Sequence, residues 1–116
     1  MSISEFINKL KSDAKSISFQ ETIAVVNANY SFTPTTFSNG NQLNKAKENN
    51  GFCTIFAFAK LYQLDKLQTL SCFGCYYFED VLQNPEGTDH QNIRNFMEYG
   101  WDGIHFENEA LSKIQL

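Results

Sequence analysis

The sequence predicts a single, mostly helical α+β domain with four or five helices and a small β-sheet, with a purely helical domain as the alternative. Three observations predict this fold class. Capping-box pairs, a Ser or Asp followed three residues later by Glu or Gln, precede several amphipathic stretches. A long segment rich in Asn and Thr separates these stretches and lacks helical periodicity. The length of 116 residues suits one domain, so residues 1–116 are expected to share one core.

Two helices are predicted near the N-terminus by their start signals. Ser2 and Glu5 form a capping box ahead of apolar residues at the i, i+3, i+4, i+7 spacing, which predicts a helix over about residues 3–12. Ser18 and Glu21 form a second box, which predicts a helix over about residues 19–29.

Residues 31–50 form the longest irregular segment. Pro34 and the turn pair Asn39-Gly40 interrupt it, and short extended pieces are expected over residues 31–33 and 36–38. Loops of this length in compact domains are often functional, although a surface loop without a functional role fits the sequence equally well.

A central buried helix is predicted after Gly51, where FCTIFAFAKLYQL places apolar residues nearly all round a helical wheel. The alternation of Phe52, Thr54 and Phe56 would also suit a strand. The length of the run, about a dozen residues without a breaker, favours the helix.

One continuous helix is expected from the box of Asp65 and Gln68 to about Leu82. Gly74 falls on its packing face, where a missing side chain lets another backbone approach closely. Cys72 and Cys75 are expected in the middle of this helix, as packing thiols.

The last predicted helix follows a connection that contains Pro85 and Gly87. Thr88 or Asp89 is expected to cap it, and Gly100 fits its C-terminal end. Trp101 is expected to cover that end. Residues 103–107 read as a short strand, and the remaining tail as loose or helical.

Composition excludes several classes of function. A net charge of −4 and a pI near 5.0 disfavour a nucleic-acid partner, because phosphate neutralisation needs clustered Lys and Arg. No apolar run approaches the roughly 20 residues that span a bilayer, and the N-terminus lacks a signal-peptide core. The expected location is therefore the cytoplasm, with no membrane partner.

The cysteines and histidines predict neither a redox site nor a metal site. Cys72-x-x-Cys75 matches a redox motif, but a packing role is favoured, with reduced thiols. His90 and His105 lie far from the cysteines in sequence, so no zinc-ligand spacing is present. No metal and no cofactor are expected, and the absence of a nucleophile or phosphate-loop motif favours a protein that is not an enzyme.

One polar cluster is predicted where the last two helices meet. A short connection favours antiparallel neighbouring helices, which would bring Tyr76 and Asp80 close to His90 and Arg94. In one interpretation these four residues bind a partner or a small polar or anionic ligand. In the other, which is favoured, they form a salt-bridged clamp between two helices.

The chain resembles the HopJ type III effector family over nearly its whole length. The resemblance rests on ANYSFTPTTFSNG, on NNG followed by IFAFAKL, on TLSCFGCYYFEDVL and on NPEGTDHQNIRNFMEYGWDGIHFE. It implies a small soluble bacterial protein that plant pathogens inject into plant host cells by a type III system, and it implies no established activity, substrate or cofactor.

The function expected from this resemblance is that of a non-enzymatic protein-interaction domain, with a host or bacterial protein as the partner. Similar proteins also occur in bacteria that infect no plant. The alternative is therefore a cytoplasmic housekeeping protein that binds or transforms a small polar or anionic ligand.

Overall fold

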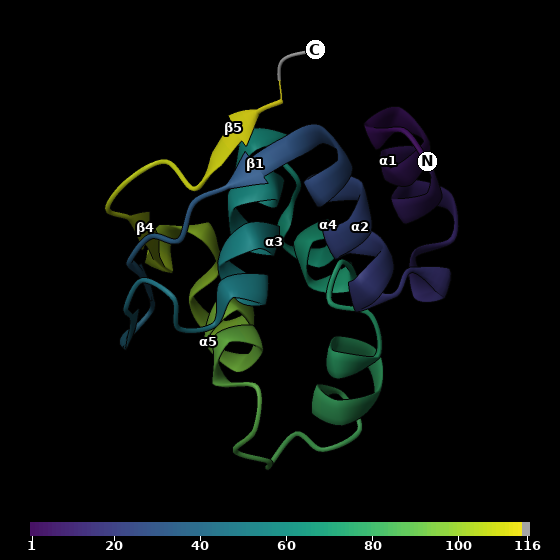
Figure 1. The fold of residues 1–116 in the computed structure, drawn as a ribbon. Coiled ribbons are helices and arrows are strands. Elements are labelled where there is room, and N and C mark those ends of the chain that lie inside the picture. Colours follow the sequence, from purple (N-terminus) through teal and green to yellow (C-terminus); the bar gives the residue numbers. More distant parts are fainter. Residues whose placement is uncertain (115–116) are drawn as a thin grey trace.

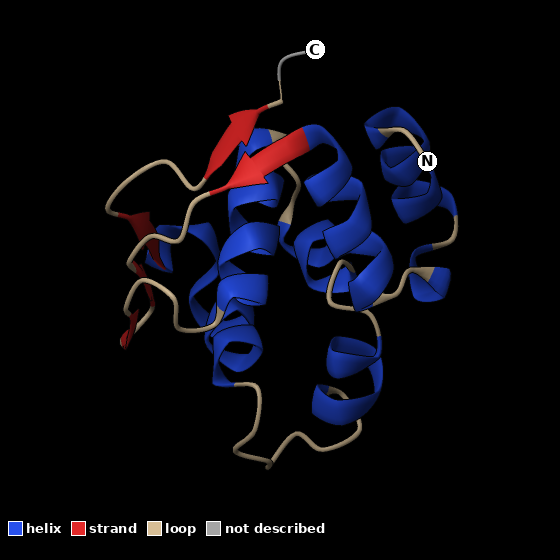
Figure 2. Cartoon of the chain, viewed as in Figure 1, coloured by secondary structure: helices blue, strands red, loops and turns tan. Residues whose placement is uncertain are grey.

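The computed structural model describes residues 1–114, and in this part of the chain helices surround one central helix while short strands cover one side (Figures 1 and 2). The helices are α1 (Ile3–Ser12), α2 (Phe19–Asn29), α3 (Asn50–Leu61), α4 (Lys66–Ser71) and α5 (Gln91–Tyr99). Two 3₁₀ turns, η1 (Ala14–Ser16) and η3 (Gly100–Gly103), and one π-helix, η2 (Tyr76–Val81), complete the helical elements.

The predicted capping boxes set the starts of three helices. The side chains of Ser2, Ser18 and Asp65 each accept a hydrogen bond from the backbone N–H three residues later, and the side chain there returns the contact. These boxes satisfy backbone donors that a helix leaves free at its start. The predicted bounds of α1 and α2 are confirmed.

Helix α3 is the centre of the core, so the helical interpretation of its sequence is confirmed and the strand alternative is wrong. Ile55, Phe56 and Phe58 are completely buried. The Phe56 ring contacts rings from three other segments: Phe37, Phe73 and Phe96, at centroid distances of 6.0, 5.2 and 5.1 Å. Aromatic packing therefore joins the strands, the α4 region and α5 to α3.

Two small antiparallel sheets confirm the α+β class and contradict the purely helical alternative. Strands β2 (Phe37–Asn39), β3 (Gln42–Asn44) and β4 (Ile104–Phe106) form one sheet in the order β3-β2-β4. Strand β1 (Tyr30–Phe32) pairs with β5 (Leu111–Lys113) in the other. The tail was expected to be loose or helical, and this prediction is wrong because β5 pairs with β1.

The single helix predicted from Asp65 to Leu82 is also wrong, because the chain turns at Gly74 and continues as η2. Gly74 has a φ of +61°, and a Cβ at this position would lie 2.8 Å from the backbone nitrogen of Phe19. The predicted close backbone approach is therefore present, in a turn and not within a helix. Cys72 lies buried in this turn and Cys75 is exposed beside it, so neither is in the middle of a helix.

A network of buried asparagines fastens α5 to the β2–β3 hairpin. The side chains of Asn44 and Asn92 exchange two hydrogen bonds, of 3.0 and 2.9 Å. Asn39 donates to the backbone oxygen of Asn92 at 2.7 Å, and Asn95 donates to that of Asn39 at 3.0 Å. At the other end of α5, Trp101 donates from Nε1 to the backbone oxygen of Leu64 at 2.9 Å, as expected of a residue that covers this end.

Candidate functional site

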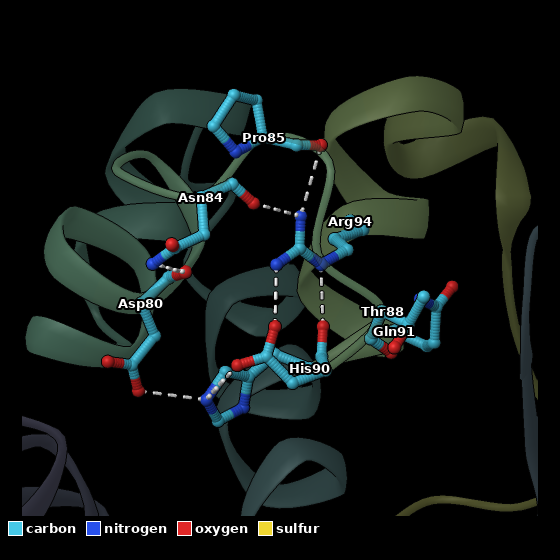
Figure 3. A network of polar contacts seen from close by, with 8 residues as sticks. Asp80, Asn84, Pro85, Thr88, His90, Gln91 and Arg94 are labelled. Carbon is cyan, nitrogen blue, oxygen red and sulfur yellow. Dashed lines mark hydrogen bonds and ion pairs between the residues drawn. The ribbon is translucent and has the colours of Figure 1, made fainter.

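The predicted polar cluster exists and lies where η2 and α5 are joined by a short connection (Figure 3). His90 Nε2 is 3.0 Å from Asp80 Oδ2. The rings of Tyr76 and His90 are stacked, with centroids 5.0 Å apart and planes 28° from parallel. The sequence prediction that Asp80 and His90 are neighbours across the turn is therefore confirmed.

Arg94 joins the cluster by reaching back from α5 to the connection (Figure 3). Its Nη2 donates to Asp89 Oδ1 at 2.6 Å, and its Nε donates to the backbone oxygen of Asp89 at 2.6 Å. Its third nitrogen, Nη1, donates to the backbone oxygen of Asn84 at 3.0 Å. Every nitrogen of the guanidinium is thus engaged within the protein, and the side chain is only 13% exposed.

Asp89 is the site residue that the sequence analysis missed. The prediction that Thr88 or Asp89 caps α5 is wrong, since His90 is the N-cap residue and the start of α5 has no side-chain capping bond. The Asp89 carboxylate instead faces Arg94 on one side and His90 on the other, with Oδ2 3.8 Å from Nε2. A hydrogen bond from Arg94 lowers the pKa of Asp89, which therefore stays ionised.

The backbone of His90 is in the left-handed conformation, with a φ of 51° and a ψ of 49°. This conformation is uncommon outside glycine and has an energetic cost. It turns the imidazole toward Asp80 and Asp89 while the next residue starts α5. No sequence pattern predicts a left-handed backbone at a histidine. The sequence could therefore predict that Asp80 and His90 lie close together, but not the backbone conformation that directs the imidazole.

Asp80, Asp89 and His90 together form a group that can hold a cation. One ligand atom from each lies within 4.8 Å of the others. Asp80 and Asp89 are about half exposed and His90 is mostly covered, with side-chain exposures of 47%, 56% and 22%. Because two carboxylates oppose the single charge of Arg94, the local charge favours a cation over an anion.

A second feature, an open groove of about 730 Å³, lies on another side of η2. We call it the η2 groove, and its walls come from α1, η1, α4 and η2. Leu67 and Leu82 line it with 61% and 45% of their surface exposed, and the partly buried Phe78 also lines it. Four exposed charged residues also line it: Lys11, Lys15, Asp65 and Glu79.

Within residues 1–114 no helix combines the length and the apolar character needed to cross a bilayer.

Comparison with known proteins identifies the family. The family model described as HopJ type III effector protein matches residues 3–111. The crystal structure of a protein of unknown function, VPA0580, shares 54% sequence identity with the chain. The similarity covers 98% of this chain and 95% of that one, with a TM-score of 0.96. A search of curated proteins gave no match. The fold and nearly the whole length are thus shared with known relatives, and the chain belongs to the HopJ type III effector protein family.

Proposed function

We propose that this protein is a non-enzymatic interaction domain that binds an amphipathic helix of a partner protein in the η2 groove. The observation that carries the proposal is the pair of leucines, Leu67 and Leu82, which expose 61% and 45% of their surface in one open groove. Exposed leucines that line the same groove leave apolar surface in water, and such surface is typical of docking sites.

The charges around the η2 groove indicate which charged side chains a complementary partner carries. The basic pair, Lys11 and Lys15, comes from α1 and η1, whereas Asp65 and Glu79 come from the start of α4 and from η2. A partner helix with apolar anchors at i, i+3 or i+4 spacing fits this groove when acidic side chains flank one side of its apolar face. Basic side chains then flank the other side.

The polar cluster supports docking indirectly. Contacts of Tyr76 and Asp80 with His90 hold η2 against α5, and η2 carries Phe78, which lines the groove. A rigid wall lowers the entropic cost of binding. A small anionic ligand at the cluster is less favoured, because the nitrogens of Arg94 are already engaged and two carboxylates face the site.

Membership of the effector family supports export by a type III system as part of this proposal. The partner is then a protein of the producing bacterium or of its host.

Site-specific crosslinking tests the groove directly. A photo-reactive amino acid at Leu67 is expected to capture a partner segment that mass spectrometry identifies. The matched control is Leu43, which is equally exposed at 61% but lies on β3, away from the groove. Circular dichroism should show that a synthetic peptide of the captured segment becomes helical on binding.

Calorimetry with that peptide supplies the quantitative test. Leu67→Asp is expected to weaken binding about tenfold or more, because it places a charge in the apolar contact, whereas Leu43→Asp leaves affinity unchanged. Equal capture at both positions would contradict the proposal. So would equal affinity of the two variants, or a bound segment that stays extended.

A further inference from the structure

We propose that Asp80, Asp89 and His90 form a binding site for a divalent transition-metal cation, with Zn²⁺ as the best fit. These three residues come from η2 and from the connection just before α5. The site is separate from the η2 groove, and its existence does not depend on the proposed docking function.

The distances between the donor atoms suit one coordination sphere. His90 Nε2 lies 3.0 Å from Asp80 Oδ2 and 3.8 Å from Asp89 Oδ2, and the three donors all lie within 4.8 Å of one another. A Zn²⁺ ion binds nitrogen and oxygen at about 2.0–2.2 Å, so its ligand atoms are roughly 3–4 Å apart. Small rotations of two half-exposed carboxylates bring all three atoms within reach.

Without a cation, the imidazole of His90 can form a hydrogen bond with the carboxylate of Asp80 but not with that of Asp89. Nε2 of His90 carries at most one hydrogen, and the 3.0 Å contact gives that hydrogen to Asp80. Asp89 Oδ2, at 3.8 Å, is beyond hydrogen-bond range of the same nitrogen. A cation between the three atoms would interact with both carboxylates and with the Nε2 lone pair, while the ring keeps its hydrogen on Nδ1.

Neighbouring residues hold two of the donors in position. Arg94 binds Oδ1 of Asp89 at 2.6 Å and leaves Oδ2 on the side of His90. Tyr76 stacks on the imidazole and fixes the plane of the ring. Outer contacts of this kind orient metal ligands in known sites, and their loss typically lowers metal affinity.

The donor set selects the kind of cation. One imidazole nitrogen with two carboxylates suits a first-row transition metal, whereas Ca²⁺ and Mg²⁺ prefer oxygen alone and larger sets of ligands. Three protein ligands leave further coordination positions to water. Among common divalent ions Zn²⁺ binds such mixed sets more tightly than Mn²⁺.

Calorimetric titration of ZnCl₂ into untagged protein, treated first with EDTA and then dialysed, tests the proposal. One ion per chain is expected. Asp80→Asn, Asp89→Asn and His90→Asn should each weaken binding about tenfold or more. Asparagine is chosen at position 90 because it tolerates the left-handed backbone.

Two control variants separate this site from the other Zn²⁺ ligands on the surface. Cys75→Ser removes the exposed thiol, and His105→Asn removes the other, exposed histidine on β4. Both are expected to bind Zn²⁺ like the parent. Nitrogen NMR of the imidazoles should show the Zn²⁺-induced change at His90 Nε2 and none at His105.

Three results would overturn the proposal: no Zn²⁺ binding up to millimolar concentration, binding abolished by Cys75→Ser, or binding unchanged in His90→Asn. Equal affinity for Mg²⁺ and Zn²⁺ would also overturn it, since that indicates a plain acidic surface. If His90→Asn fails to fold, the half-exposed Asp80→Asn variant decides the question.

Discussion

At the scale of single residues, burying an asparagine costs free energy unless its amide, once removed from water, finds hydrogen-bond partners inside the protein. Asn39, Asn44 and Asn92 are almost completely inaccessible. Asn92 is the centre of the network: its side-chain oxygen accepts from Asn39 and Asn44, and its nitrogen donates to Asn44. These contacts fix the position of α5, and with it the position of His90 and Arg94.

Asn92→Ala is therefore expected to lower the free energy of unfolding by about 2–4 kcal/mol, since it leaves buried amide groups of Asn44 and Asn39 with missing partners. The urea midpoint measures this change. Gln91→Ala, at the exposed neighbouring position, is the control and should change stability by no more than about 0.5 kcal/mol. A loss of the same size in both variants would show that the network contributes nothing specific.

Gly74→Ala is expected to destabilise the protein by about 2–4 kcal/mol. The left-handed φ of +61° disfavours any side chain, and the new Cβ would meet backbone atoms of Phe19 and Ile17 at 2.8 and 3.0 Å. Backbone atoms cannot swing away as a side chain would. Thermal or urea unfolding checks the sign, with Cys75→Ala as the exposed neighbouring control. A Gly74→Ala protein as stable as its parent would contradict the close contact.

At the scale of elements, the sequence predicted where helices begin but not where a helix is broken. The boxes at Ser2, Ser18 and Asp65 predicted the first residues of α1, α2 and α4 because a cap is a local interaction. The turn at Gly74 was missed because apolar residues on both sides of it, Leu70 and Tyr77, face the same core. Periodicity therefore continues through a break in the helix.

Strands β3 and β5 and part of the site escaped prediction for a related reason, whereas β1, β2 and β4 overlap the extended segments that were expected. β3 and β5 contain three residues each, too few for an alternating pattern, and their pairing is a tertiary contact. Asp80 and His90 could be paired because antiparallel elements joined by a short connection bring these positions together. Asp89 could not, because its direction depends on the left-handed backbone of His90 and on the contact with Arg94.

The Arg94 contact between α5 and the connection predicts a dependence on pH. The hydrogen bond from Arg94 lowers the pKa of Asp89 below its ordinary value of 3.8, so the contact stabilises the fold above that pH. The stabilisation is lost as the pH falls through the lowered pKa. Arg94→Met should raise the Asp89 pKa toward 3.8, which carboxyl NMR titration measures.

The difference in stability between parent and Arg94→Met should accordingly be largest near neutral pH and shrink below about pH 4. Lys66→Met is the control, because this exposed residue lies at the start of α4 and makes no ion pair with Asp89 among the described residues. An Asp89 titration that is the same in the parent and in Arg94→Met would refute the interpretation of the contact.

At the scale of the whole molecule, one core makes all elements depend on one another. The Cα radius of gyration is 13.4 Å, which matches the roughly 13 Å expected of a compact domain of about 100 residues. Cys53 and Cys72 are almost completely buried in this core, and Cys75 lies outside it. The thiols can therefore report whether the core opens as a unit.

We expect a thiol reagent to modify one cysteine quickly in the native protein and all three after unfolding. Burial raises the pKa of the Cys72 thiol to about 12 and also raises that of Cys53, so both stay protonated and unreactive. In Cys75→Ser the fast reaction should disappear. A native protein with two or three fast thiols, or with a Cys72–Cys75 disulfide after mild oxidation, would contradict this arrangement.

The pairing of β1 with β5 also affects the solubility of shortened chains. Backbone hydrogen bonds continue the pairing on both sides, from Thr33 to Ala110 at 2.8 Å and from Ile114 to Asn29 at 3.1 Å. A chain that ends before Ala110 keeps α3 and most of the core but leaves one edge of β1 without its partner. Such an edge can pair with the same edge of another copy, so the first effect of C-terminal trimming should be self-association.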